Sequence, residues 1–149
     1  MTSPCQNNFY VTLLSNASRD IYEQNTHADY TVKLAQPIDL GSTSNWEVGV
    51  CEISCSLSPE GSNPVLLYCN VISPQLLGDS TVRCIRTFQV YPNAMCQDEY
   101  QNVQYVPMEQ RKFQEIRIEF LKTEGSHIPF DDSTMPTKVV LHFRKNYQW

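Results

Sequence analysis

Short runs of β-branched and aromatic residues, separated by proline, glycine, asparagine, aspartate and serine, recur along the whole sequence. Runs of this kind are typical of β-strands joined by turns, and the spacing of long amphipathic helices is scarce. The pattern therefore predicts an all-β protein. About eight antiparallel strands are expected, at residues 9–14, 30–34, 46–56, 65–72, 81–90, 103–106, 113–121 and 138–144.

Alternation of apolar and polar residues predicts which side of several strands faces the core. In the run 30–34, Tyr30, Val32 and Leu34 share one face. The last strand places His142 and Arg144 on the face opposite its most apolar residues, so we expect that outer face to be partly covered. The inward residues expected in the last two runs are Ile116, Ile118, Phe120, Val139, Leu141 and Phe143.

The length and the uneven connections indicate how the strands assemble. A chain of 149 residues has the usual size of one domain, so we expect a single domain over 1–149 with flexible tails at 1–8 and 145–149. Long and irregular connections favour a two-sheet sandwich, a single jelly roll or a related Greek key, over an up-and-down barrel. One helical turn is expected at 108–112, before the strand that begins at Phe113.

Composition limits the partners that the chain can recognise. A net charge of −5 at pH 7 provides no basic footprint for phosphate backbones or anionic lipid, so we expect no nucleic-acid partner. No run approaches about 18 apolar residues, so no membrane insertion is expected. The first ten residues lack the features of a signal peptide, and the simplest expectation is an unprocessed intracellular product.

The six cysteines are then expected to remain thiols, because structural disulfides belong mainly to oxidising compartments. Cys51 and Cys55 are the one closely spaced pair in the sequence. In a regular strand they share a face but lie about 13 Å apart, too far to bind one zinc ion. Cys96 lies among acidic residues, a setting that disfavours a reactive thiolate.

Local signatures of catalysis are missing from the sequence. It contains no nucleophile elbow, no phosphate-binding glycine loop and no His-Glu-x-x-His motif. His27, His127 and His142 lie far apart, and none has a cysteine or a second histidine at metal-ligand spacing. The acid pairs at 98–99 and 131–132 occur in turn-like segments. We therefore expect a protein that is not an enzyme and has no cofactor, and we assign no catalytic, cofactor-binding, metal-ligating or interface residue.

The order of several segments is informative beyond composition. The chain opens with 9–18, continues through Tyr22, 25–34 and 37–40, and reaches Trp46-Glu47-Val48-Gly49-Val50-Cys51-Glu52-Ile53. Segments 105–108, 113–118, 125–130 and 141–144 follow. Together they resemble the single-jelly-roll minor capsid proteins, or pentons, of Polinton/Maverick elements and adintovirus-like viruses, whose strand block reads W-E-V-G-L-x-E-I. The resemblance covers most of 9–144, and 54–63 and 91–101 do not match.

The resemblance implies a structural role without catalysis. Five copies would form a homopentamer that closes a fivefold vertex of an icosahedral virion, beside a double-jelly-roll major capsid protein. Assembly would take place inside the host cell, with nucleus and cytoplasm both open. A head-to-tail interface closes into a ring when its rotation is one fifth of a turn. The block that begins at Trp46 is interpreted first as a core strand rather than as an interface.

Two other classes of function stay open at this stage. Jelly rolls also serve as binding modules for carbohydrates or receptor ligands, and such a module predicts a secretory route and disulfides. A cupin-type enzyme would need several histidines and a carboxylate on facing strands to hold a metal, whereas the three histidines here are dispersed. The chain could also be a capsid protein of this kind that a host genome has retained.

Overall fold

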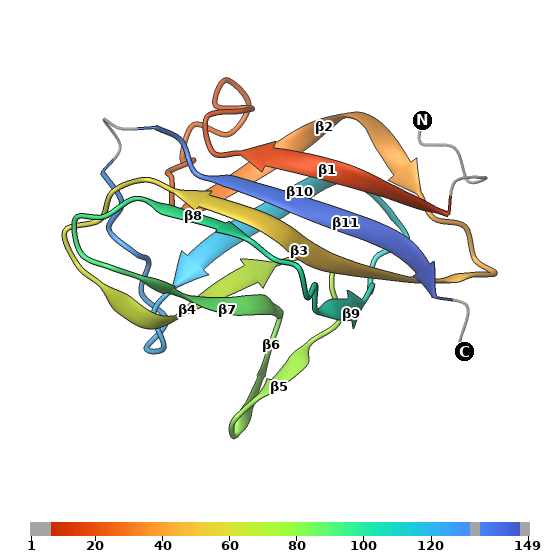
Figure 1. Ribbon diagram of the computed structural model, residues 1–149. Helices are drawn as coiled ribbons and strands as arrows, with labels where there is room; N and C mark the ends of the chain where they lie inside the picture. Colours follow the sequence, from red (N-terminus) through yellow and green to blue (C-terminus); the bar gives the residue numbers. More distant parts are fainter. Residues whose placement is uncertain (1–6, 132–134, 147–149) are drawn as a thin grey trace.

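The computed structural model describes residues 7–131 and 135–146. Within these ranges the chain forms eleven strands and two principal sheets (Figure 1). The strands are β1 (Asn8–Leu14), β2 (Asp29–Asp39), β3 (Asn45–Cys55), β4 (Ser62–Cys69), β5 (Gln75–Leu77), β6 (Ser80–Val82), β7 (Cys84–Val90), β8 (Cys96–Glu99), β9 (Tyr105–Pro107), β10 (Lys112–Leu121) and β11 (Lys138–Asn146).

The strand pairs are nested around the middle of the chain. β1 pairs with β11, β2 with β10, β3 with β8 and β9, and β4 with β7, all antiparallel. Successive pairs alternate between a five-stranded sheet, ordered β1-β11-β3-β8 with β9 also on β3, and a four-stranded sheet, ordered β2-β10-β4-β7. A long hairpin rolled around a core produces this order. The all-β antiparallel sandwich predicted from the sequence is confirmed, and its arrangement is jelly-roll-like.

Apolar side chains from both sheets meet in one core. Tyr30, Phe120 and Phe143 are among its largest fully buried side chains, and Trp46 is buried at the start of β3. Every inward residue predicted in β10 and β11 is fully buried, as the alternation requires. The interpretation of the Trp46 block as a core strand is therefore consistent with its burial.

The strand β3 departs from regular alternation and corrects one prediction. Its pairing with β11 shifts between Val140 and Leu141, so that β3 carries an extra residue beside Cys51. Because of this β-bulge, even-numbered residues face the core before Cys51, and odd-numbered residues face it afterwards. Cys55 consequently lies in the core, whereas the half-buried Cys51 thiol donates to the Val140 carbonyl oxygen at 3.4 Å. The two cysteines do not share a face, contrary to the sequence prediction.

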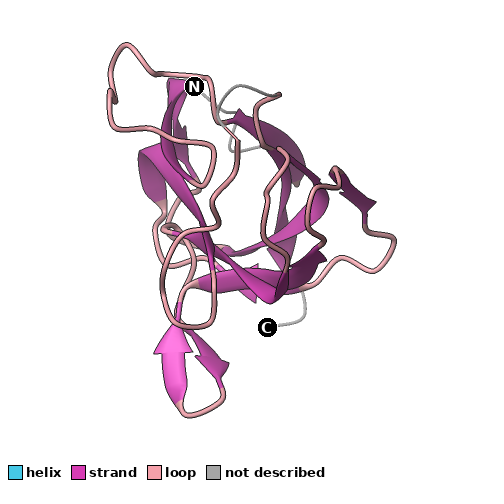
Figure 2. Cartoon of the chain, turned by 90° about the vertical axis from the view of Figure 1, so that its left-hand side faces the viewer, coloured by secondary structure: helices cyan, strands magenta, loops and turns pink. Residues whose placement is uncertain are grey.

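The segment between β4 and β7 differs most from the expectation. The expected strand 81–90 is divided into β6 and β7 at Arg83, whose carbonyl oxygen accepts from the Cys69 amide. β5 and β6 form a separate hairpin that projects from the sandwich in both views (Figures 1 and 2). Its two-residue loop places Gly78 at a positive φ of 62°, a conformation that glycine adopts without a Cβ clash.

One further expectation is wrong within the described residues, and the strands reach into both expected tails. The helical turn expected at 108–112 does not form, because the backbone amides of Met108 and Glu109 donate to Trp46 and Val71 of other segments. Asn8 lies in β1, and residues 145 and 146 lie in β11, so the two strands extend into the segments expected as tails. The remainder of both expected tails, 1–6 and 147–149, lies outside the described residues, and no helix among the described residues is long and apolar enough to cross a membrane.

Candidate functional site

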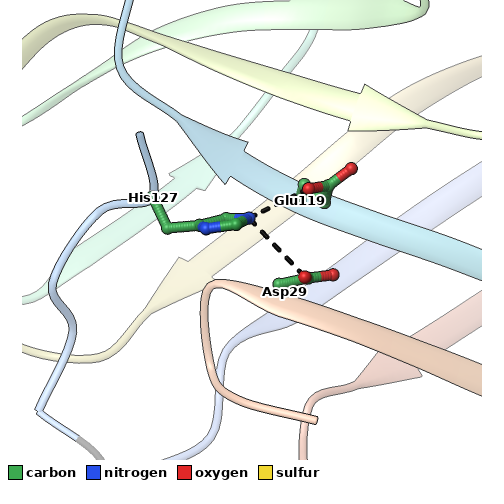
Figure 3. Close-up of side chains that lie close together, drawn as sticks. All are labelled: Asp29, Glu119 and His127. Carbon is green, nitrogen blue, oxygen red and sulfur yellow. Dashed lines mark hydrogen bonds and ion pairs between the residues drawn. The ribbon is translucent and has the colours of Figure 1, made fainter. Parts of the chain in front are cut away.

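Four charged or ionisable side chains meet on the outer face of the four-stranded sheet. Asp29 begins β2, Arg117 and Glu119 lie on β10, and His127 follows β10 on the next loop. The register places Glu119 directly opposite Asp29. Tyr30 and Ile118, the strand neighbours of these residues, are buried in the core, so Asp29, Arg117 and Glu119 point to the outer surface. Figure 3 shows Asp29, Glu119 and His127 close together. We call these four residues the Asp29 cluster.

The geometry of the Asp29 cluster is that of an ion-pair network. The Arg117 guanidinium donates from Nε and NH2 to the two Asp29 carboxylate oxygens, both at 3.0 Å. Arg117 NH2 also lies 3.4 Å from Glu119 Oε1. His127 Nε2 lies 2.9 Å from Glu119 Oε1 and 3.6 Å from Asp29 Oδ2. The hydrogen bond and charge of Asp29 raise the pKa of Arg117, so the guanidinium stays charged.

The same residues offer the ligand set that a divalent cation could use. One ligand atom from each of Asp29, Glu119 and His127 lies within 4.8 Å of the others. Both carboxylates, however, already contact the Arg117 guanidinium, whose single positive charge offsets one of their two negative charges. The ion pairs join β2, β10 and the loop at 127.

Two hollows flank the Asp29 cluster. One, of about 470 Å³, is lined by the loop segment 21–25 together with Asp29, Thr31 and Arg117. The other, of about 310 Å³, is lined by segments 26–29 and 127–130, including both His27 and His127. His27 is buried and its Nδ1 lies 2.6 Å from the Ser15 hydroxyl oxygen. The fold thus brings two of the dispersed histidines to the same hollow, although only His127 belongs to the Asp29 cluster.

The third histidine lies on the outer face of the other sheet. The His142 ring stacks on Tyr10 with centroids 4.3 Å apart. His142 Nε2 lies 3.3 Å from Asn8 Oδ1, which can only accept, so the Nε2 atom carries the ring proton and donates it. Nδ1 is then an acceptor, and the Tyr105 hydroxyl donates to it at 2.7 Å. Arg144 lies over the Tyr105 ring, 3.4 Å from its centroid. Burial and the Arg144 charge lower the pKa of His142, so the neutral ring is favoured. The expected partial covering of this face is confirmed.

Large exposed apolar side chains occur on two different flanks of the sandwich, and Met135, before β11, is exposed as well. The first flank is the β1 and β2 side, where Tyr10, Leu14 and Ile21 are exposed. The second flank is the β7 and β8 side with the projecting hairpin, where Leu76, Tyr91 and Met95 are exposed. Leu76 is the extreme case, with 85% of its surface exposed. Figure 1 shows β1 and β2 along the top and the β5–β6 hairpin at the bottom.

The other residues weighed in the sequence have structural surroundings. Asp98 lies on β8, where its Oδ2 accepts from the Cys96 thiol and the Tyr100 hydroxyl, each at 3.4 Å. Glu99 lies opposite Glu52 in the β3–β8 pairing. Asp131 is exposed, and position 132 lies outside the described residues. None of these positions belongs to the Asp29 cluster.

Sequence spacing could not reveal the Asp29 cluster, since Asp29 and Glu119 are far apart in the chain and meet only through the β2–β10 register. The outward positions of Arg117 and Glu119 were predictable from the alternation in 113–121, but their partner strand was not. Neither a protein-family model nor a curated protein matches the sequence.

Proposed function

We propose that this protein is a structural subunit, a penton-type minor capsid protein, that assembles head to tail into a homopentamer at the fivefold vertices of a virion. The observation that carries the proposal is the presence of exposed apolar side chains on two different flanks of a jelly-roll-like sandwich. A double-jelly-roll major capsid protein would be its neighbour in the particle. The role needs matching surfaces rather than a catalytic constellation.

The first flank supports the proposal through its edge strand. Among residues 7–131 and 135–146, β1 pairs with β11 alone, so its other side is an open sheet edge within this part of the chain. Tyr10 is 63% exposed on this strand, and Ile21 is 53% exposed on the following loop. An open edge with large apolar side chains is a surface that another chain can cover.

The second flank supports the proposal through the hairpin. Among the described residues, β5 and β6 pair with each other and with no other strand. Leu76 on this hairpin is therefore left exposed rather than packed on the sandwich. A hollow of about 200 Å³ separates the hairpin from β7 and β9, and Leu76 and Ile85 are among its lining residues. A projecting arm with an apolar side chain is suited to contact a neighbouring subunit.

The difference between the flanks decides the type of assembly. A two-fold dimer uses the same patch on both subunits, whereas a ring joins two unlike patches. Because the apolar residues lie on opposite sides of the sandwich, each subunit can contact one neighbour through β1 and another through the hairpin. Unlike flanks permit head-to-tail assembly, which closes into a ring when the rotation between copies is a whole fraction of a turn, and the closed ring of five copies follows from the resemblance to pentons.

The experiment is to disable each flank separately in the full chain. One variant carries Tyr10→Ser and Ile21→Ser, and the other carries Leu76→Ser and Tyr91→Ser. We expect each variant alone to be monomeric by light scattering, while an equal mixture forms a dimer with one copy of each, because one intact flank of each kind remains. Thr81→Ser, at an exposed position of the same hairpin, should assemble as the unmodified protein does.

The outcomes separate this function from the alternatives. If the mixture stays monomeric while the unmodified protein assembles, the interface is not head to tail and the proposal is wrong. If the unmodified protein is monomeric at every concentration, the binding-module alternative is favoured, with the same exposed aromatic surface available to a carbohydrate or a receptor ligand. Circular dichroism of each variant verifies that the strands are retained.

A further inference from the structure

The cysteines Cys55 and Cys96 lie directly opposite each other on paired strands. Cys55 ends β3, Cys96 begins β8, and the register of the two antiparallel strands pairs them residue to residue. Directly opposed residues of antiparallel strands have Cα atoms about 4.5 or 5.5 Å apart. Both separations lie inside the range of about 4.4–6.8 Å that a disulfide requires.

The two side chains also point to the same place. Cys55 is fully buried in the core, and Cys96 packs against that core while remaining partly exposed. Directly opposed residues of an antiparallel pair point to the same face of the sheet, and the Cys96 thiol also donates to Asp98 Oδ2 at 3.4 Å. No side-chain movement across the sheet is needed to bring the sulfur atoms together.

From this geometry we propose that Cys55 and Cys96 form a reversible disulfide when the folded protein meets a small disulfide oxidant such as oxidised glutathione. Cys96 is the accessible thiol and reacts first: its thiolate attacks one glutathione sulfur, forming a mixed disulfide and releasing one glutathione. The Cys55 sulfur then attacks the Cys96 sulfur, loses its proton and displaces the second glutathione. The two cysteines lose two electrons and two protons, and one oxidised glutathione becomes two reduced molecules.

The order of the two steps follows from the surroundings of each thiol. The hydrogen bond to Cys96 and burial both raise the pKa of the Cys55 thiol, so Cys55 stays protonated until the mixed disulfide has formed. The partly exposed position of Cys96 gives the oxidant access that Cys55 lacks. Cys96 is therefore the thiol that attacks the oxidant in the first step, and Cys55 is the resolving thiol that attacks the Cys96 sulfur in the second. The neighbouring Asp98 carboxylate disfavours the Cys96 thiolate, so the first step is expected to be slow and to need prolonged incubation.

The disulfide would fasten an edge strand. β8 pairs with β3 only between Glu52 and Cys55, so it is held by a short ladder at the rim of the five-stranded sheet. Edge segments with few pairing partners open more readily than central strands. A bond from β3 to β8 would hold the second flank in place, and this effect on the subunit is independent of whether the flank contacts another subunit.

Peptide mapping of the full chain tests the proposal. The folded protein is incubated with oxidised glutathione, free thiols are blocked, and the product is cleaved after Lys, Arg and Glu. These cleavages isolate Cys55 in the fragment 53–60 and Cys96 in the fragment 87–99. We expect the two fragments joined, with a mass lower by two hydrogens, and a thermal midpoint raised by about 5–10 °C. Reduction should restore the original values.

Matched variants make the result specific. Cys96→Ser should abolish both the joined fragments and the rise in thermal midpoint, and Cys55→Ser should leave glutathione attached to Cys96. Cys69→Ser and Cys84→Ser should change neither, because Cys84 lies opposite Tyr68 rather than opposite Cys69. A different cysteine pair, or no joined fragments after prolonged oxidation of the unmodified folded protein, would overturn the proposal.

Discussion

At the scale of single residues, the surroundings of His142 illustrate how an exposed strand face becomes structured. The ring is stacked on Tyr10, accepts a hydrogen bond from Tyr105 and donates to Asn8. Three strands, β1, β9 and β11, thereby share one polar contact on the outer face of the sheet. Protonation of Nδ1 would remove the acceptor that Tyr105 uses, and it would place a second positive charge beside Arg144.

A pH dependence of stability follows from this contact. Burial and Arg144 lower the pKa of His142 below its usual value of 6.5. As the pH falls below about 6.5, the unfolded state therefore binds more protons than the folded state, and the free energy of unfolding decreases. Well above pH 6.5 the ring is neutral in both states, so His142 does not change the free energy of unfolding with pH. Urea unfolding between about pH 5 and 8 measures this slope. His142→Gln should flatten the slope, and an unchanged slope would contradict the assignment.

Gly49 is a second residue with a specific requirement. The segment at 103–104 crosses closely over β3, and a Cβ at position 49 would lie 2.7 Å from the Gln104 carbonyl oxygen and would also overlap the Val103 side chain. We expect Gly49→Ala to reduce the free energy of unfolding by about 1–3 kcal/mol, because the backbone at 103–104 must move. Thr12→Ala, on the same sheet but exposed, is the control. Equal effects of the two variants in chemical denaturation would refute this account.

At the scale of elements, the strands of the sandwich could be predicted because apolar and polar residues alternate along them. Alternation in 30–34, 113–121 and 138–144 was sufficient to predict strands and their buried faces, since burial on one side imposes a period of two. The bulge at Cys51 was not predictable, because both parities of β3 carry apolar residues and the shift depends on pairing with β11. The hairpin at 75–82 was also missed, because its exposed Leu76 gives no alternation signal.

The candidate sites were less predictable than the strands. The Asp29 cluster depends on the β2–β10 register, and the Cys55–Cys96 pair depends on the β3–β8 register. Neither register is encoded in local spacing, since the paired strands are separated by long connections. A topology predicted first, with pairs nested as in a rolled hairpin, would have placed both sets of residues on neighbouring strands.

The Asp29 cluster predicts an order of effects for strands β2 and β10. Arg117→Gln leaves the Asp29 and Glu119 carboxylates opposite each other without the guanidinium that contacts both, with His127 as their one remaining partner in the cluster, and like charges in that position repel. Asp29→Asn removes one charge and leaves Arg117 beside Glu119. We expect Asp29→Asn to cost about 1 kcal/mol or less, since the pair is partly exposed, and Arg117→Gln to cost more.

Urea unfolding at low and high salt measures the free energy of unfolding of both variants. The difference between them should shrink at high ionic strength, because salt screens exposed charges. Equal costs for Arg117→Gln and Asp29→Asn, or a difference that salt does not change, would show that electrostatic repulsion does not set the order. Lys112→Gln, whose ammonium lies 3.9 Å from Asp39 and is largely exposed, serves as the control and should have little effect.

At the scale of the whole molecule, the nested strand pairs leave two unlike flanks available for contact. The β1 edge lies on one side of the sandwich, and the hairpin with the β7 and β8 side lies on the other (Figure 1). The core is filled from both sheets, so the exposed apolar side chains are not needed to complete it. Head-to-tail contact between unlike flanks would bury them in every subunit of a closed ring.

The most direct test of the proposed homopentamer is the native mass of the purified full chain, measured by native mass spectrometry over a range of concentrations. We expect a discrete closed species of five times 17.2 kDa, present without a ladder of larger open polymers. A monomer at every concentration, a two-fold dimer, or a closed ring with another number of copies would contradict the proposed assembly.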